Sequence, residues 1–139
     1  VVAGTGTQRA TFEQLAESLG VASRVQFLGE VNDDDLVELY AGALAVVYPP
    51  FDEDFGYVTL EAFLSKKPVV TTTDAGEPST FVIDGVNGRV TAPDPDALAE
   101  AISALAADPA RAARCGLAGY EWARLITWDD TIDRLVAGL

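Results

Sequence analysis

Residues 48–73 read Y-P-P-F-D-E-D-F-G-Y-V-T-L-E-A-F-L-S-K-K-P-V-V-T-T-T, a stretch that combines two apolar segments with several carboxylates. We expect the end of a buried strand, an acidic loop, a short helix and a second buried strand. A turn at Gly56 just before a helix start leaves backbone N–H groups free to bind an anion. Glu53 in the loop and Glu61 in the helix would suit ligand hydroxyls. The stretch therefore indicates a ligand with both phosphates and hydroxyls.

Short apolar segments alternate with helical periodicity along the rest of the chain. The wholly apolar segment 45–48 is expected to be a strand buried on both faces. The alternation predicts one α/β domain over residues 1–139, a parallel sheet with helices on both faces. The expected strands are 1–3, 24–29, 45–48, 68–72 and 89–91, and the expected helices are 8–19, 32–43, 58–65, 79–83, 94–107, 108–124 and 128–136.

Ligands of such sheets bind beyond the carboxyl ends of the strands, in the loops that precede the helices. Four loops of this sequence meet that description. We expect them to be neighbours, and the acidic loop is one of them. They are residues 4–7, 29–32, 49–57 and 72–76.

The chain has a formal net charge of −13 and no histidine. Such a protein should repel nucleic acid and anionic membrane surfaces, and it offers no histidine as a general base. No apolar run is long enough to cross a bilayer. The single cysteine, Cys115, lies in a helical stretch and is expected to pack in the core, which fits a cytoplasmic location. Because the sequence begins abruptly at Val1 and lacks methionine, we expect a piece of a longer protein.

Several polar motifs have two interpretations each. Gly4-Thr5-Gly6 lacks the third glycine of a dinucleotide-binding turn, so it either lets a helix pack on the sheet or brings backbone close to a ligand. Residues 52–54 contain Asp-x-Asp, which can hold a metal, but three adjacent acids favour a solvated loop. Residues 32–35 are expected to supply the N-cap and the acidic first turn of a helix. Glu61 lies in an apolar helix, so it is either on a wet face or held, paired, for a hydroxylated ligand.

Glu53-x7-Glu61, followed by P-V-V-T, resembles the Glu-x7-Glu signature of retaining GT-B glycosyltransferases, in particular family 4 (group 1). Four more segments resemble that family in the same order. The resemblance implies the C-terminal half of a GT-B fold, a Rossmann-like parallel sheet lacking its first strand–helix unit. The additional segments are 1–6 (V-G-x-G), 24–29 (R-V-x-F-L-G), 84–88 (D-G-x-N-G) and 127–128 (Ser/Thr-Trp).

The resemblance also implies a role for each matching residue. Glu53, the catalytic residue, would accept hydrogen bonds from hydroxyls of the donor sugar, and Glu61 would bind the ribose hydroxyls. The remaining residues would bind the donor through backbone or helix-end groups: Phe55, Gly56 and Tyr57 the sugar and diphosphate, Val58 and Thr59 the phosphates, Arg24 and Val25 the base, and Gly4 the donor at close approach.

The implied activity is transfer of a hexose, with retention, from a UDP- or GDP-type sugar to an acceptor bound by a missing N-terminal domain. No metal and no cofactor are expected, and the location would be cytoplasmic or peripheral to the inner membrane through that domain. The alternatives are a GT-B epimerase or phosphorylase, such as a sucrose- or trehalose-linked enzyme, or a non-catalytic nucleotide-binding module.

The sequence departs from the family's pattern in several places. The Arg and Lys that hold the phosphates would precede Val1, so we expect the fragment alone to be inactive and to bind donor weakly. Lys66 replaces the usual glycine after the helix, and Thr80 replaces the glutamate of a G-G-x-x-E turn. Lys66 and Lys67 lie at the far end of the helix, where they are poorly placed to bind phosphate.

Overall fold

The computed structural model describes residues 1–137, and the chain divides into two compact units, Val1–Leu39 and Tyr40–Leu139. Each unit combines parallel strands with α-helix, so the predicted α/β class is confirmed. The single domain over residues 1–139 stays a prediction.

The first unit is a small parallel pair of strands with one helix. Val2 pairs with Phe27, and the Gly4 N–H donates to the Gly29 carbonyl at 2.7 Å, which joins the two predicted loops of this unit. The expected strand 24–29 is shorter and begins at Phe27. Arg24 is the last residue of a 3-10 helix, in which its N–H donates to the Val21 carbonyl at 2.8 Å. The elements are β1 (Val2–Ala3), α1 (Arg9–Ser18), η1 (Ala22–Arg24) and β2 (Phe27–Gly29).

Helix α2 (Asp33–Gly42) contains the boundary between the two units. Its start is capped as expected, since the Asp35 N–H donates to the Asn32 side-chain oxygen at 2.9 Å. Asp33, Asp34 and Asp35 occupy the first turn, where negative charge is favourable beside the helix dipole.

The second unit holds a three-stranded parallel sheet in the order β3-β4-β5. All four residues of the central strand β4 are buried. The expectation that segment 45–48 is buried on both faces is wrong, because β3 lies at the edge of this sheet and Val47 is 45% exposed. The strands are β3 (Val46–Val47), β4 (Val69–Thr72) and β5 (Gly88–Thr91).

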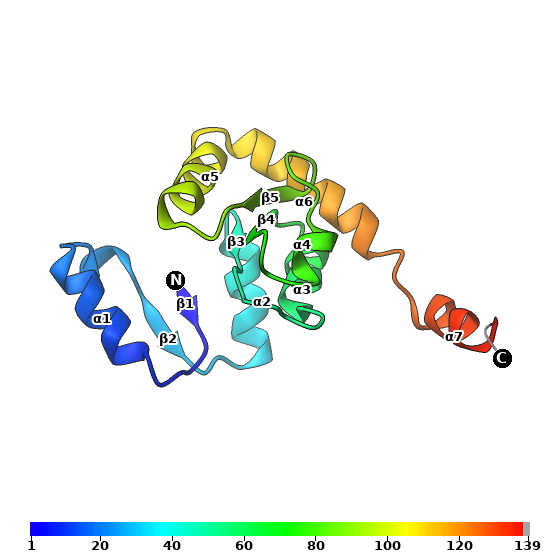
Figure 1. Ribbon diagram of the computed structural model, residues 1–139, viewed down its shortest axis with the longest axis horizontal. Helices are drawn as coiled ribbons and strands as arrows, with labels where there is room; N and C mark the ends of the chain where they lie inside the picture. The colour runs from blue at the N-terminus through cyan, green and yellow to red at the C-terminus, as the bar shows by residue number, and fades with distance from the viewer. Residues whose placement is uncertain (138–139) are drawn as a thin grey trace. The chain divides into compact units, whose positions relative to one another are not determined.

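Helices cover both faces of this sheet (Figure 1). Successive residues of β4 point to opposite faces. Val69 packs with Phe63 of α3, whereas Val70 packs with Leu105 of α5, and α6 contributes an alanine to each cluster. Cys115 of α6 is buried, as expected. The helices are α3 (Tyr57–Leu64), α4 (Pro78–Phe81), α5 (Pro95–Ala107), α6 (Pro109–Ala123) and α7 (Trp128–Ala137).

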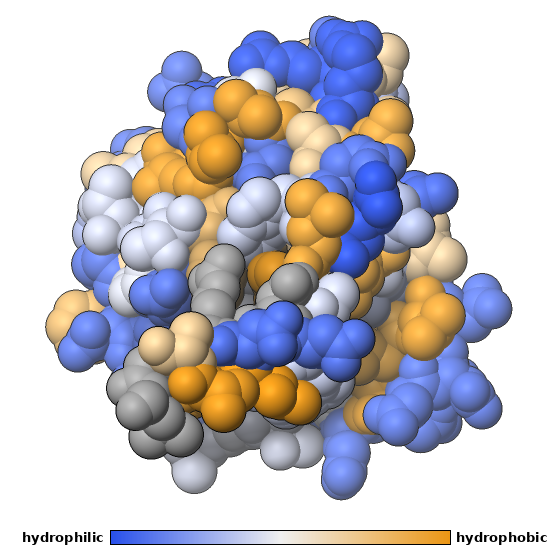
Figure 2. Space-filling view, turned by 90° about the vertical axis from the view of Figure 1, so that its right-hand side faces the viewer, coloured by the Kyte–Doolittle hydropathy of each residue, from blue (hydrophilic) through white to orange (hydrophobic). Residues whose placement is uncertain are grey.

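Helix α7 leaves apolar side chains exposed, including Trp128 at 81% and Leu135 at 71%. Apolar and hydrophilic side chains alternate over the face of the molecule that Figure 2 presents. Among the described residues, no helix is both long and apolar enough to span a membrane.

Candidate functional site

The acidic loop, residues 49–57, is tied to the turn at residues 72–76 by main-chain hydrogen bonds. The Asp52 and Glu53 N–H groups donate to the Asp74 and Ala75 carbonyls at 2.9 and 3.1 Å. Glu53 and Gly76 also form a parallel β-bridge. Two of the four predicted loops therefore meet in this unit, and the other two meet in the first unit. A single set of four loops stays a prediction.

Gly56 is the N-cap of α3 and adopts a left-handed conformation, with φ of 74° and ψ of 62°. It is buried, and a Cβ added there would collide with the ring of Pro78 and lie 3.3 Å from Cε1 of Tyr48. Only glycine adopts this left-handed conformation readily and also fits where there is no room for a Cβ. No side chain of the described residues caps this helix end. The first turn of α3 therefore offers backbone N–H groups to an anion, as the sequence predicts.

Glu61 lies in the second turn of the same helix, and it is exposed rather than buried. Glu61 therefore lies on a solvent-exposed face of the helix, and its role toward a hydroxylated ligand stays a prediction. Its Oε2 accepts a hydrogen bond from the Tyr40 hydroxyl at 2.9 Å. Burial of the phenol, followed by that hydrogen bond, raises the pKa of Tyr40, so the hydroxyl keeps its proton.

Glu53 is partly buried in the acidic loop, and its Oε2 accepts from the Tyr48 hydroxyl at 3.1 Å. Burial and then the bond to Glu53 raise the pKa of Tyr48 as well. Neither tyrosine was predicted as a site residue. The signal available in the sequence was a phenol in an otherwise apolar segment, since a buried tyrosine usually finds a partner for its hydroxyl.

A row of aromatic rings anchors the loop between the two carboxylates. The Phe55 ring lies 4.8 Å from the Tyr57 ring and 5.4 Å from the Phe81 ring, centroid to centroid. Phe81 in turn contacts Trp122 of α6 at 5.3 Å. These contacts tie Phe55 to the core and leave Tyr57 70% exposed.

Val58 is partly buried and Thr59 is fully buried in the first turn of α3. The Thr59 hydroxyl has no hydrogen-bond partner among the described residues, although the Thr59 N–H donates to the Gly56 carbonyl at 2.9 Å. Both residues are thus at the helix start where the sequence predicts them.

The remaining predicted donor-binding residues belong to the first unit. Gly4 has a φ of 114°, and a Cβ added there would meet no heavy atom within 4 Å, so close helix packing does not explain this glycine. It lines an open cavity of about 370 Å³ together with Gly6 and Phe27. Arg24 ends the 3-10 turn and Val25 follows it in extended conformation.

The departures from the family's pattern have local explanations. Lys66 adopts a φ of 58°, the left-handed conformation that the missing glycine would favour. Its Nζ lies 4.9 Å from the centroid of the Tyr120 ring, and Lys67 Nζ donates to the Ala41 carbonyl at 2.9 Å. Both lysines follow the C-terminal end of α3, as predicted, while Gly56 marks its N-terminal end. The Thr80 hydroxyl donates to the Glu77 carbonyl at 2.9 Å.

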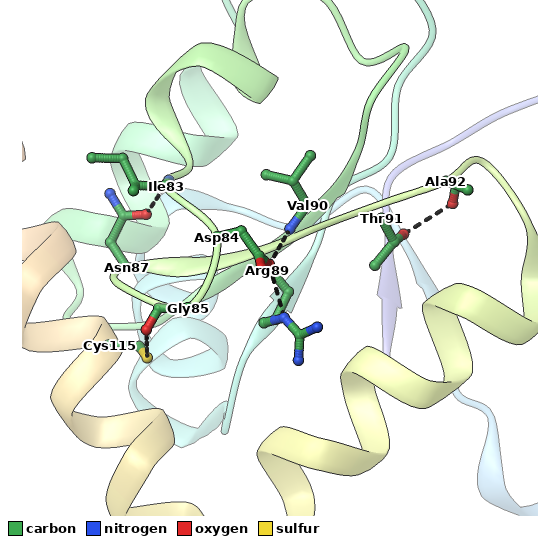
Figure 3. Close-up of polar contacts among 9 residues, drawn as sticks. All are labelled: Ile83, Asp84, Gly85, Asn87, Arg89, Val90, Thr91, Ala92 and Cys115. Atoms are coloured by element: carbon green, nitrogen blue, oxygen red, sulfur yellow. Dashed lines mark hydrogen bonds and ion pairs between the residues drawn. The ribbon is translucent and has the colours of Figure 1, made fainter.

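The turn at residues 84–88 is built around a buried asparagine (Figure 3). Asn87 is 2% exposed. Its side chain accepts from the Ile83 N–H at 2.7 Å and donates to the Phe81 carbonyl at 3.0 Å. The amide group is therefore used inside the turn.

The aspartate of the same turn is also engaged internally (Figure 3). Asp84 Oδ1 accepts from Arg89 Nε at 2.8 Å and from the Val90 N–H at 3.0 Å. Burial opposes ionisation of Asp84, but these two donors outweigh it and lower its pKa. The Cys115 thiol lies 3.9 Å from the Gly85 carbonyl, which closes the turn against α6.

Comparison with known proteins places the chain among glycosyltransferases. Residues 1–122 match the family Glycosyl transferases group 1. The chain is 38% identical over 135 residues to the D-inositol 3-phosphate glycosyltransferase of Salinispora tropica, covering 96% of this chain and 28% of the relative. It is 40% identical over 126 residues to that of Mycolicibacterium vanbaalenii, covering 89% and 27%. The chain thus spans less than a third of these two relatives.

Solved structures agree. Sucrose-phosphate synthase from Thermosynechococcus elongatus superposes with a TM-score of 0.83 at 30% identity, over 96% of this chain and 36% of that one. Anabaena HepE in complex with UDP-glucose gives a TM-score of 0.83 at 30% identity, over 99% and 40%. With nearly the whole length matched by the family and by these folds, the chain belongs to the Glycosyl transferases group 1 family and has the α/β fold of its GT-B members.

Proposed function

We propose that this chain is the donor-binding part of a longer hexosyltransferase, which transfers a sugar from a nucleotide diphosphate to an acceptor with retention. The observation that carries the proposal is the pair of tyrosine-held carboxylates around one uncapped helix start. Glu53 lies before Gly56 and Glu61 after it, each with its Oε2 bonded to a phenol. A diphospho-sugar joined to a ribose presents the matching phosphates and hydroxyls.

The expected binding energies indicate that the carboxylates and the helix start bind different parts of the donor. A hydrogen bond to a charged group contributes about 1.5–3 kcal/mol, so one carboxylate on ribose hydroxyls gives about ten- to a hundredfold in affinity. A helix N-terminus contributes about 0.3–1 kcal/mol for each nearby charge. That is little for a diphosphate in a chain of net charge −13. Positive side chains from the rest of the longer protein complete the phosphate site.

In the proposed reaction, a hydroxyl of the acceptor forms a bond to the anomeric carbon of the sugar while the bond between that carbon and the diphosphate breaks. Negative charge develops on the leaving phosphate, which takes up the proton of the acceptor hydroxyl. Backbone N–H groups in the first turn of α3, preorganised by Gly56, stabilise that charge. Glu53 orients the sugar through its hydroxyls, and Glu61 holds the ribose. No metal and no cofactor take part. The longer protein works in the cytoplasm, and its missing domain binds the acceptor.

The comparisons support a nucleotide-sugar donor. HepE has been solved with UDP-glucose, with UDP and glucose, and with UDP. The curated relatives are named for D-inositol 3-phosphate, which makes that compound the first acceptor to test.

The decisive experiment titrates the full-length protein with UDP- and GDP-sugars by calorimetry and measures sugar transfer. We expect Glu61→Ala to weaken donor binding by about ten- to a hundredfold. Glu100→Ala is the matched control, because Glu100 is exposed on α5 and belongs neither to the acidic loop that holds Glu53 nor to α3, which holds Glu61. Unchanged affinity and turnover in Glu61→Ala would contradict the proposal.

The same assays separate the alternatives. A non-catalytic module binds donor without transferring sugar, whereas an epimerase or phosphorylase converts the sugar without the acceptor or releases a sugar phosphate. Loss of activity with a chelator would point to metal at the Asp-x-Asp of residues 52–54 and would overturn the metal-free mechanism.

A further inference from the structure

We propose that Tyr40 and Tyr48 are positioning residues, each holding one carboxylate of the site so that its second oxygen faces the ligand. Tyr40 would thereby control binding of the nucleotide, and Tyr48 would control recognition of the sugar. This inference rests on the proposed function and deepens it.

Both phenols are rigid supports. The Tyr40 and Tyr48 rings pack against the buried cluster that contains Phe63 and Val69. The Tyr48 N–H also donates to the Val70 carbonyl at 2.9 Å, which fixes its backbone in the sheet. A hydroxyl carried on a ring packed against the core has little freedom to move.

The two glutamates need such supports for different reasons. Glu61 is exposed on a helix surface, where a free glutamate side chain samples many rotamers and loses entropy when it binds a ligand. Glu53 lies on a loop, and its backbone is fixed by the bridge to Gly76, but its side chain extends beyond that bridge. One hydrogen bond to Oε2 restricts each side chain and reduces the entropy lost on binding.

A phenol is also a suitable hydrogen-bond donor for a carboxylate that must still bind a ligand. A carboxylate has two oxygens and about four lone-pair directions, so a single hydroxyl leaves most of its acceptor capacity for ligand hydroxyls. Arg or Lys would neutralise the carboxylate and occupy more of it. The raised pKa values keep both phenols protonated and donating.

The two tyrosines should therefore have separable effects. Tyr40→Phe removes the bond to Glu61, and we expect about tenfold weaker binding of free UDP, a raised KM for the donor and little change in kcat. Tyr48→Phe removes the bond to Glu53, and we expect free UDP to bind within about twofold of wild type. The preference for UDP-glucose over UDP, and kcat with it, should fall.

The experiment uses the full-length protein, with UDP and UDP-glucose as probes and GDP and GDP-mannose as a second pair. Tyr120→Phe is the matched control, because Tyr120 lies on α6 beside Lys66. Melting temperatures establish that each variant is folded.

A double-mutant cycle distinguishes positioning from general destabilisation. If Tyr40 acts through Glu61, the effect of Tyr40→Phe on UDP binding disappears in the Glu61→Ala background. The corresponding cycle for Tyr48 uses Glu53→Ala and the UDP-glucose preference. Equal effects in both backgrounds, in a wild type that binds donor, would overturn this inference and leave the proposed function intact. If wild type binds none of the four probes, the proposed function fails and this inference with it.

Discussion

The acidic loop at residues 49–57 and the turn at residues 84–88 both match motifs of the family, yet they use their polar groups differently. In the turn, Asn87 and Asp84 bond to neighbouring main-chain and side-chain groups, and Asn87 is 2% exposed. In the loop region, Glu53 and Glu61 each accept from one neutral phenol. A motif whose polar groups are satisfied internally maintains the fold, whereas one with remaining acceptor capacity is available to a ligand.

Asn87→Ala removes the buried side chain of the turn at residues 84–88 and has the largest expected effect on stability. The change leaves the Ile83 N–H without its acceptor and removes the donor to the Phe81 carbonyl. We expect about 2–4 kcal/mol of destabilisation in urea unfolding, since both hydrogen bonds of a buried side chain are lost. The Ile83 amide should also exchange its hydrogen faster.

Donor affinity of folded Asn87→Ala protein should equal that of wild type. Asn32→Ala is a suitable control, because it removes an exposed helix cap and should cost only about 1 kcal/mol. If fully folded Asn87→Ala protein bound the donor much more weakly, the turn at residues 84–88 would contribute directly to the donor site.

Gly76→Ala tests the acidic loop at residues 49–57, and we expect it to destabilise the protein less than Asn87→Ala does. Gly76 has a φ of 75°, and a Cβ there would lie 2.5 Å from the Glu53 carbonyl oxygen. We expect about 1–3 kcal/mol of destabilisation from the strained backbone. Because the main chain of Glu53 must shift, binding of UDP-glucose should weaken more than binding of UDP.

Gly20→Ala provides the control for backbone strain. Gly20 also has a positive φ, 68°, but a Cβ there meets nothing within 4 Å. Gly20→Ala should therefore destabilise the folded protein without changing the preference for UDP-glucose over UDP. Equal preferences in wild type and Gly76→Ala would show that the bridge does not position Glu53.

The sequence predicts the elements well where a local signal marks them. Asn32 caps α2, and Asp94 caps α5. The Asp94 side-chain oxygen accepts from the Asp96 N–H at 2.9 Å. Gly56 is at the predicted helix start, and its left-handed backbone follows from the lack of a Cβ. Lys66 shows the limit of such signals, since it adopts a left-handed φ of 58° that its residue type does not favour.

Burial and partners depend on tertiary packing, which a local pattern does not contain. Segment 45–48 is more apolar than β4, which contains two threonines, but Val47 is 45% exposed because sheet order makes β3 an edge strand. Glu61 lies among apolar neighbours in sequence, yet the helix turns it outward. Its partner Tyr40 is 21 residues away, a separation that no spacing rule connects.

Asp84→Asn tests by pH whether the carboxylate of the turn at residues 84–88 is satisfied internally, and it has the smallest expected effect. Since the pKa of Asp84 is lowered in the folded state, its contribution to stability is complete above the ordinary value of 3.8 and is lost as pH falls through the folded-state value. The stability difference between wild type and Asp84→Asn should therefore be constant near neutral pH and shrink in acid below about pH 4. The difference is small because the Asp84 side chain is 55% exposed. Urea midpoints measured across this range at fixed ionic strength test it, with Asp96→Asn on the exposed first turn of α5 as control. A difference that grows in acid would mean that Arg89 and the Val90 N–H do not hold the ionised carboxylate, and that the turn is not satisfied internally.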